Sequence, residues 1–222
     1  MRYLLTGPTR GDISRFNEYK ECNFVILGDA FLDNPKILKK LDAGDNVFYC
    51  VRGLDKKVSY IENLDQTFDE YVQGFVWYDK KYPFIRYLID GQIYKFDDVK
   101  CLVLGGGSNP DENIQLVKKD KNLTLDTGYK HQDNIYKRVV GKDVDLLLTY
   151  SKLSNNLNGE TEQFIDKVEK HINWKYWFVG RFNEDIDITP KIKYINEDLI
   201  DFAQFKVIKH DDDEYNLIDL GV

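Results

Sequence analysis

The 222-residue chain has no long apolar run and only three cysteines. No apolar segment approaches the length of a membrane span, and no cationic start leads into an apolar signal core, so we expect a cytoplasmic protein. Cys22, Cys50 and Cys101 are odd in number and lie in or beside apolar strand-like runs. This placement indicates reduced, buried thiols rather than disulfides or a metal site.

An excess of basic residues, a linker and a repeat are also missing. The net charge of −7 argues against a nucleic-acid-binding surface, which needs a basic face to neutralise phosphate. No Pro/Gly/Ser-rich stretch divides the chain, so residues 1–222 are expected to form one domain. A hydrophobic content of 42%, with fifteen Tyr and thirteen Phe, is typical of a folded protein with a sizeable core.

Strand-like and helix-like patterns alternate in the first quarter of the chain. Apolar runs at residues 3–5, 23–27 and 46–51 predict strands, and residues 13–19 and 35–41 predict the helices between them. Pro35 suits a first helical turn. This β-α-β-α-β order indicates parallel strands joined by crossover helices.

The rest of the chain continues with strands and amphipathic helices. Asp90-Gly91 stands between two alternating runs and predicts a β-hairpin. Helices are expected at residues 113–119, 133–140 and 160–172, and further strands at 84–89, 92–96, 100–104, 144–149, 174–179, 192–195, 205–208 and 216–220. The simplest architecture is an α/β fold of two sheets covered by helices on both outer sides.

Five predicted strand ends carry turn motifs in a fixed order. They read TGPTRG at residues 6–11, GDAFLDN at 28–34, VRGLD at 51–55, LTY at 148–150 and GRFN at 180–183. This series resembles the calcineurin-like metallophosphoesterase family, bacterial and phage type, whose blocks read Gly-Asp-x-His-Gly, Gly-Asp-x-x-Asp, Gly-Asn-His-Asp/Glu, Thr-His and Gly-His-x-His. Residues 87–94 and 101–108 resemble the mid-domain hairpin and glycine turn of that family. The resemblance covers nearly the whole chain and implies a four-layer α-β-β-α sandwich of two mixed β-sheets flanked by helices.

The chain departs from the family at nearly every metal-ligand position. By resemblance, two metal ions would be held at these strand ends. The family's ligand or proton-donor positions are occupied here by Pro8, Arg10, Asp29, Leu54, Asp55, Tyr150, Arg181 and Asn183. Among these positions only Asp29 is still a metal-ligand residue, at the place of the family's bridging carboxylate. Asp55 stands where the family has its proton-donating histidine.

This substitution pattern implies that hydrolysis has been lost. Two-metal hydrolysis needs paired cations to generate hydroxide and to stabilise the leaving oxygen. Guanidinium cannot deprotonate to become a ligand, and two arginines beside one carboxylate repel cations. We therefore expect no catalytic residues, no metal and no cofactor. A rebuilt site in which Asp29, Asp33 and Asp55 hold one magnesium ion stays open as a residual phosphodiesterase.

The arginines at these strand ends have two interpretations. Arg10, Arg181 and Asp29 could form an internal ion-pair cluster that replaces the metals, which we favour because buried charges usually find internal partners. Alternatively, Arg10, Arg52 and Arg181 could keep an anion pocket, because guanidinium binds phosphate as well as carboxylate.

The function expected from these features is binding rather than catalysis. The first hypothesis is a pseudoenzyme that binds a protein partner, with a phage-encoded inhibitor of a host protein as a sub-case. The alternative is a binder of a phosphorylated small molecule or nucleotide, and membrane binding is not expected. Three further features have an ordinary structural interpretation: Gly105–Gly107 as a tight turn, His171 as a residue that caps or packs the end of its helix, and His131 and His210 as loop residues. The aromatic run at residues 75–78 fits either an exposed recognition loop or, by default, a hairpin or core packing.

Overall fold

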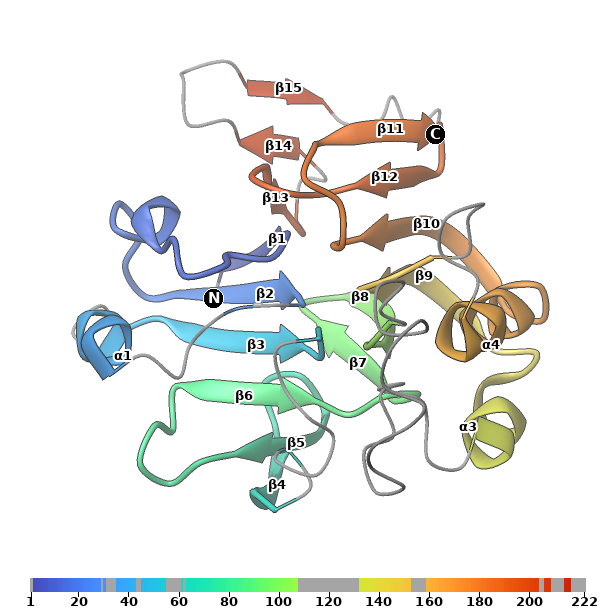
Figure 1. Cartoon of the computed structure of the whole chain (residues 1–222), viewed down its shortest axis with the longest axis horizontal. Coiled ribbons are helices and arrows are strands. Elements are labelled where there is room, and N and C mark those ends of the chain that lie inside the picture. The colour runs from blue at the N-terminus through green and yellow to red at the C-terminus, as the bar shows by residue number, and fades with distance from the viewer. Residues whose placement is uncertain are drawn as a thin grey trace, which may run out of the picture.

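The computed structural model describes residues 2–28, 30, 35–42, 45–54, 61, 63–107, 132–152, 159–203, 206–208 and 214–216. Nine strands form the larger sheet, in the order β15-β14-β13-β1-β2-β3-β6-β5-β4 (Figure 1). Their bounds are Arg2–Thr6 (β1), Cys22–Leu27 (β2), Val47–Val51 (β3), Asp65–Asp69 (β4), Gly74–Tyr78 (β5), Ile85–Leu88 (β6), Leu199–Asp201 (β13), Lys206–Ile208 (β14) and Glu214–Asn216 (β15). The central strands β1, β2, β3 and β6 pair in parallel, and the outer strands pair antiparallel.

Six strands form the second sheet, in the order β11-β12-β10-β9-β8-β7. Their bounds are Ile93–Phe96 (β7), Val99–Leu104 (β8), Asp143–Thr149 (β9), Asn173–Val179 (β10), Ile186–Thr189 (β11) and Ile192–Tyr194 (β12). Here β8, β9, β10 and β12 are parallel, while β7 and β11 run antiparallel to their neighbours. Both sheets are therefore mixed, and the chain has the predicted α/β class.

Helices flank the two sheets on opposite sides (Figure 1). The helix α1 (Pro35–Asp42) contributes Leu38 and Leu41 to an apolar cluster with the outward-facing residues of β2 and β3. On the other side, α3 (Gln132–Val139) and α4 (Glu160–Glu169) pack on outward-facing residues of β8, β9 and β10. None of the helices in these described segments is long and apolar enough to cross a membrane.

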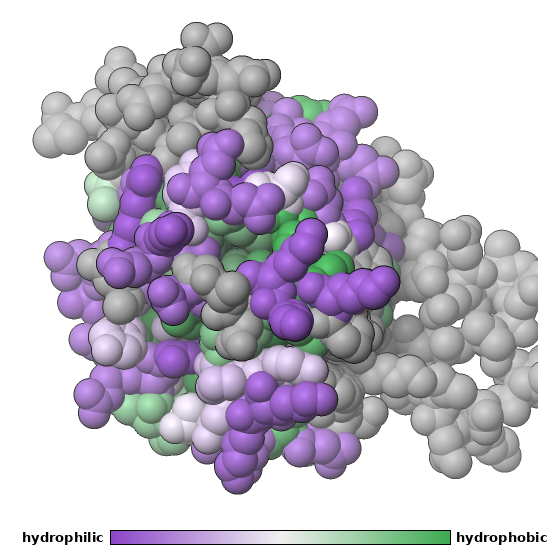
Figure 2. Space-filling view, turned by 90° about the vertical axis from the view of Figure 1, so that its left-hand side faces the viewer, coloured by the Kyte–Doolittle hydropathy of each residue, from purple (hydrophilic) through white to green (hydrophobic). Residues whose placement is uncertain are grey.

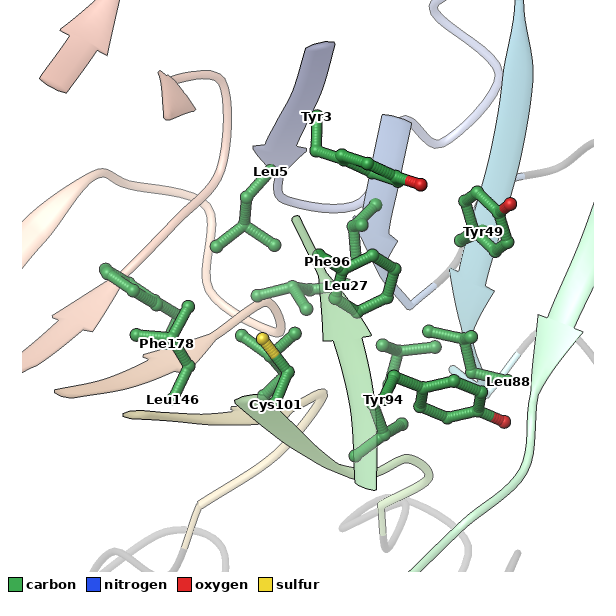
Figure 3. Packing of buried hydrophobic residues seen from close by; sticks show 14 of the residues in the cluster. Tyr3, Leu5, Leu27, Tyr49, Leu88, Tyr94, Phe96, Cys101, Leu146 and Phe178 are labelled. Atoms are coloured by element: carbon green, nitrogen blue, oxygen red, sulfur yellow. The ribbon is translucent and has the colours of Figure 1, made fainter. Parts of the chain in front are cut away.

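The main core lies between the two sheets. Tyr3, Leu5 and Tyr49 from the larger sheet meet Tyr94, Phe96 and residues of β8 to β10 from the smaller one (Figure 3). Alternate residues of each inner strand point into this layer, because side chains on a strand alternate between its two faces. The other residues of β2, β8 and β9 point outward into the two helix-covered clusters, which explains why these strands read as continuous apolar runs.

The predicted hairpin at Asp90-Gly91 is wrong. Strand β6 pairs with β3 and β5 in the larger sheet, whereas β7 pairs with β8 in the smaller sheet. Gly91 has a φ of +74° and donates its N–H to the Val103 carbonyl at 2.8 Å, so the turn leads the chain from one sheet to the other. Tertiary pairing has thus overridden a strong local hairpin signal.

Other differences concern short elements. The helix predicted at residues 13–19 is a 3₁₀ turn, η1 (Ser14–Phe16), whose N-terminal N–H donates to the Asp12 side chain at 2.9 Å. The backbone hydrogen bonds of this turn join residues three apart rather than four, as when the Tyr19 N–H donates to the Phe16 carbonyl at 3.2 Å. The segment is therefore a 3₁₀ turn and not an α-helix. Strands β4, β11 and β13 were not predicted, and β5 covers the aromatic run at residues 75–78, whose hairpin interpretation is confirmed by its antiparallel pairing with β4. The helix predicted at residues 113–119 lies outside the described residues.

Candidate functional site

The carboxyl ends of the parallel strands of both sheets meet in one place. A Cβ atom built on Gly180, after β10, would lie 2.0 Å from the Leu27 carbonyl oxygen at the end of β2. A Cβ on Gly105, after β8, would lie 2.6 Å from the Arg52 carbonyl oxygen after β3. These close approaches involve three of the five strand ends singled out by sequence, those of β2, β3 and β10, together with the glycine turn after β8, and we call this region the strand-end site.

Arg181 lies in this site and forms a buried ion pair with α4. Its Nη1 is 3.1 Å from Oε1 of Glu162, and the two side chains are 11% and 0% exposed. The same Glu162 oxygen accepts the Ser151 hydroxyl at 2.7 Å, and Arg181 Nη1 is 3.3 Å from that hydroxyl oxygen. One carboxylate therefore joins the ends of β9 and β10 to the first turn of α4.

Arg52 lies after β3 and has a carboxylate partner of its own. Its Nε and Nη2 donate to Oδ2 of Asp90 at 3.0 and 2.7 Å, and the Arg52 side chain is 5% exposed. The second Asp90 oxygen accepts the Gly105 N–H at 2.6 Å. Asp90, predicted as a hairpin residue, thus ties the β3 end of the larger sheet to the β8 end of the smaller one.

Arg10 is the exposed arginine of the three. Its backbone is in the left-handed region, with a φ of +48°, and its Nη2 donates to the Arg181 carbonyl oxygen at 3.3 Å. Pro8 is buried beside it, and the Thr9 hydroxyl donates to the Ala30 carbonyl at 2.6 Å. The loop after β1 therefore contacts the ends of both β2 and β10.

Sequence reasoning missed a further guanidinium behind this loop. Arg15, on η1, is 6% exposed and donates to the Thr6 hydroxyl at 2.9 Å and the Asn196 carbonyl at 2.7 Å. Burial lowers the pKa of Arg15, partly offset by the carboxylates of Glu197, Asp12 and Asp185. Arg15 holds the start of the loop to the segment that follows β12.

The remaining predicted positions divide between buried and exposed. Tyr150 is 3% exposed, and its ring lies where a Cβ on Gly28 would clash at 2.0 Å; Gly28 has a φ of +101°. Leu54 is half-buried, and Asn183 is exposed, with its carbonyl accepting Asn196 Nδ2 at 3.1 Å. Asp29, Asp33 and Asp55 lie outside the described residues.

The favoured interpretation, an ion-pair cluster of Arg10, Arg181 and Asp29, is tested only in its two arginines, because Asp29 lies outside the described residues. Arg10 and Arg181 do lie together, as the hypothesis required. In the described part of the chain the carboxylate on Arg181 comes from Glu162, which lies outside the five sequence blocks. A signal was present, because Glu162 stands three residues before Ile165 on the apolar face of α4, where an acidic side chain needs a partner.

Side chains that bind metals do not gather in the described segments. Within them, no group of three or more His, Cys, Asp or Glu residues is placed to hold a metal ion. His171 packs edge-on against Tyr136 with ring centroids 5.5 Å apart, in agreement with its predicted packing role, while His131 and His210 lie outside these segments. The three cysteines are buried thiols outside any disulfide, as expected, and burial raises the pKa of the Cys101 thiol well above its usual value.

A pocket of about 200 Å³ lies at the opposite, amino-terminal edge of the larger sheet. It lies between η1 and α1 and is lined by Ile13, Phe16, Asn17, Tyr19, Lys20, Lys40, Leu41 and Asn46. The face that carries α1 is largely hydrophilic, with apolar residues visible between charged ones (Figure 2). None of the positions singled out by sequence lines this pocket.

Comparison with known proteins found no relative. No family model, no curated protein and no solved structure matches the chain.

Proposed function

We propose that this chain is a catalytically inactive, metallophosphoesterase-like protein that acts by binding a protein partner. The proposal includes the four-layer α-β-β-α arrangement. It is supported by the three apolar clusters, one between the sheets and one under the helices on each outer side. It is supported as well by the order of the five sequence blocks at the strand ends.

The observation that carries the proposal is the pairing of guanidinium with carboxylate at the strand-end site. Arg181 stands at a position where the resemblance implies a histidine ligand, and its guanidinium binds Glu162. Arg52, in the third block, binds Asp90. A guanidinium group stays protonated and has no electron pair to give to a metal ion, so neither arginine can act as a metal ligand. A fold that keeps its core while its strand ends are closed by internal ion pairs is suited to binding through its surface.

The nucleotide-binding alternative has less support from the same geometry. Two of the three arginines of the hypothetical anion pocket, Arg52 and Arg181, already donate to carboxylates. A phosphate group would have to displace Asp90 or Glu162 from them, leaving a buried carboxylate without its partner. Arg10 is exposed, but a single exposed guanidinium is a weak anion site.

An affinity capture tests the proposal. The tagged full-length chain is incubated with lysate of the bacterium that carries or receives its gene, and each recovered protein is then purified and titrated against the untagged chain. We expect one protein to bind the purified chain saturably without any added nucleotide or metal. If no recovered protein binds in that titration, the proposed function is wrong.

A further inference from the structure

We propose that the pocket between η1 and α1 binds a small organic anion, a carboxylate or a phosphate monoester carried on one ring or a short apolar chain. The pocket lies at the amino-terminal edge of the larger sheet, on the face that carries α1 (Figure 2). It is separate from the strand-end site at the carboxyl ends of the strands. The inference goes beyond the proposed function and does not rest on the binding of a protein partner.

The size of the pocket limits what it can hold. Its volume of about 200 Å³ is close to that of cavities of about 150 Å³ that bind a single benzene molecule. Pockets that enclose drug-sized ligands usually begin at about 300 Å³. The pocket is therefore large enough for one ring or a short chain with a small head group, and too small to enclose a nucleotide.

The floor of the pocket is apolar and already packed. Ile13, Phe16 and Leu41 line it, and all three are buried members of the cluster that α1 covers. The Phe16 ring lies 4.5 Å from the Phe24 ring and 5.1 Å from the Phe48 ring, measured between centroids. Because the core holds these side chains in place, an apolar group that enters would bury its surface against a pre-formed wall.

Two lysines give the pocket its charge. Lys20 and Lys40 line it, both are exposed, and neither ammonium group forms an ion pair or a hydrogen bond with the described residues. No aspartate or glutamate is among the described residues that line the pocket. Glu18 and Glu21 flank Lys20 in the sequence but do not line the pocket or pair with Lys20. Both ammonium groups can therefore donate to the oxygens of a carboxylate or phosphate.

Asn46 fixes the backbone that carries Lys20. Its side chain is buried and lines the pocket, with Nδ2 donating to the Tyr19 carbonyl at 2.9 Å and Oδ1 accepting the Cys22 N–H at 3.0 Å. These two bonds hold the chain on both sides of Lys20, and the Tyr19 N–H also donates to the Phe16 carbonyl at 3.2 Å. Only the lysine side chains would have to be ordered on binding, which lowers the entropic cost.

Titration of the wild-type full-length chain with small probes, followed by NMR, tests this inference. The probes are 3-phenylpropionate, phenyl phosphate, the neutral 3-phenylpropanamide, and acetate, which lacks the ring. We expect at least one of the two aromatic anions to bind at least about fivefold more tightly than both the amide and acetate, because the amide lacks the charge and acetate lacks the apolar group. The tighter aromatic anion identifies the head group. A smaller preference for both anions, or no binding of either up to about 10 mM, would overturn the inference.

Two double variants locate the binding on the molecule. Lys20→Gln/Lys40→Gln is expected to weaken the tighter aromatic anion by at least about fivefold, because both ammonium groups are lost. Lys39→Gln/Lys142→Gln is the matched control, since it changes the net charge equally and removes two exposed lysines that do not line the pocket. The control should leave the affinity within about twofold of wild type. Unchanged affinity in Lys20→Gln/Lys40→Gln, or an equal loss in both variants, would overturn the inference.

The neutral amide shows whether the lysines act through their charge. Because both lysines are exposed and unpaired, Lys20→Gln/Lys40→Gln should fold as wild type does and bind 3-phenylpropanamide with the same affinity as wild type. A selective loss of the anion would support the inference. An equal loss of the anion and the amide would overturn it, because the two ammonium groups would then make no contribution of their own.

Discussion

Arg181, at the end of β10, and Glu162, in the first turn of α4, form an ion pair in which the carboxylate is fully buried. The pair stands at a strand end where the sequence resemblance implies a metal-binding histidine. Its partners Ser151 and Gly107 come from the ends of two further segments: a Cβ on Gly107 would lie 2.7 Å from Arg181 Nη1. The ion pair therefore fastens together the ends of β9 and β10 and the start of α4.

Removing one member of this pair should destabilise the protein strongly. Glu162→Ala would leave the Arg181 guanidinium, 11% exposed, without its carboxylate, and we expect a loss of about 3–5 kcal/mol in the free energy of unfolding. Urea denaturation followed by circular dichroism measures it. The double variant Glu162→Leu/Arg181→Met should be less destabilised than the sum of the two single changes. A loss below about 1 kcal/mol for Glu162→Ala would show that the pair is not structural.

Gly180→Ala tests the close approach of the two sheets. The new methyl group would lie 2.0 Å from the Leu27 carbonyl oxygen, so the backbone of β2 or β10 must shift. We expect a destabilisation of about 1–3 kcal/mol, typical of overpacking in a filled core. Gly141→Ala is a useful reference, because Gly141 has a φ of +72° but nothing within 4 Å of its added Cβ. Thermal unfolding that is affected less by Gly180→Ala than by Gly141→Ala would contradict the convergence of the strand ends.

The pH dependence of stability should include a contribution from Asp145 on β9. Partial burial raises its pKa, but the Lys175 ammonium at 2.8 Å and the Lys100 N–H outweigh that effect, so the pKa of Asp145 is lowered overall. A lowered folded-state pKa stabilises the protein above the unfolded pKa of about 4 and ceases to do so as the pH falls through the folded value. The stability difference between wild type and Asp145→Asn should therefore be present at neutral pH and shrink in acid. A difference that grows as the pH falls would contradict this sign.

A thermal-shift assay with inorganic phosphate and a nucleotide panel tests the anion-pocket alternative. Because Arg52 and Arg181 already bind Asp90 and Glu162, we expect no saturable rise in melting temperature. Arg10→Ala serves as the control, since it removes the exposed guanidinium. A shift that appears in wild type and vanishes in Arg10→Ala would support a phosphate site instead.

Most of the regular elements could be predicted from the sequence, because the pattern of apolar residues that marks a helix or strand lies within the element itself. The strands β2, β8 and β9 read as apolar runs, and each is buried on both faces. The turn at Asp90-Gly91 could not be predicted from local signals, since the partners of β6 and β7 come from distant parts of the chain. Strand β4 was missed because four of its five residues are exposed, which leaves no alternation to detect.

The candidate site was predicted in position but not in its pairing. Motif order indicated that the strand ends would meet, and the described residues bring Arg10, Tyr150 and Arg181 together. Glu162 and Asp90, which neutralise Arg181 and Arg52, belong to none of the sequence blocks. The place of Glu162 on the apolar face of α4 indicates that it needs a partner, but a carboxylate that reaches an arginine from another element leaves no spacing pattern with it, so only the folded arrangement shows that the partner is Arg181.

The most direct test of the proposed lack of catalytic activity is Mn²⁺-dependent hydrolysis of bis(p-nitrophenyl) phosphate by the purified full-length chain. We expect no hydrolysis above the protein-free Mn²⁺ control, because Arg181, at a position where the sequence resemblance implies a histidine ligand, binds Glu162 and cannot hold one of the two cations that such hydrolysis needs. Hydrolysis that depends on Mn²⁺ and is abolished by Asp29→Asn would contradict it.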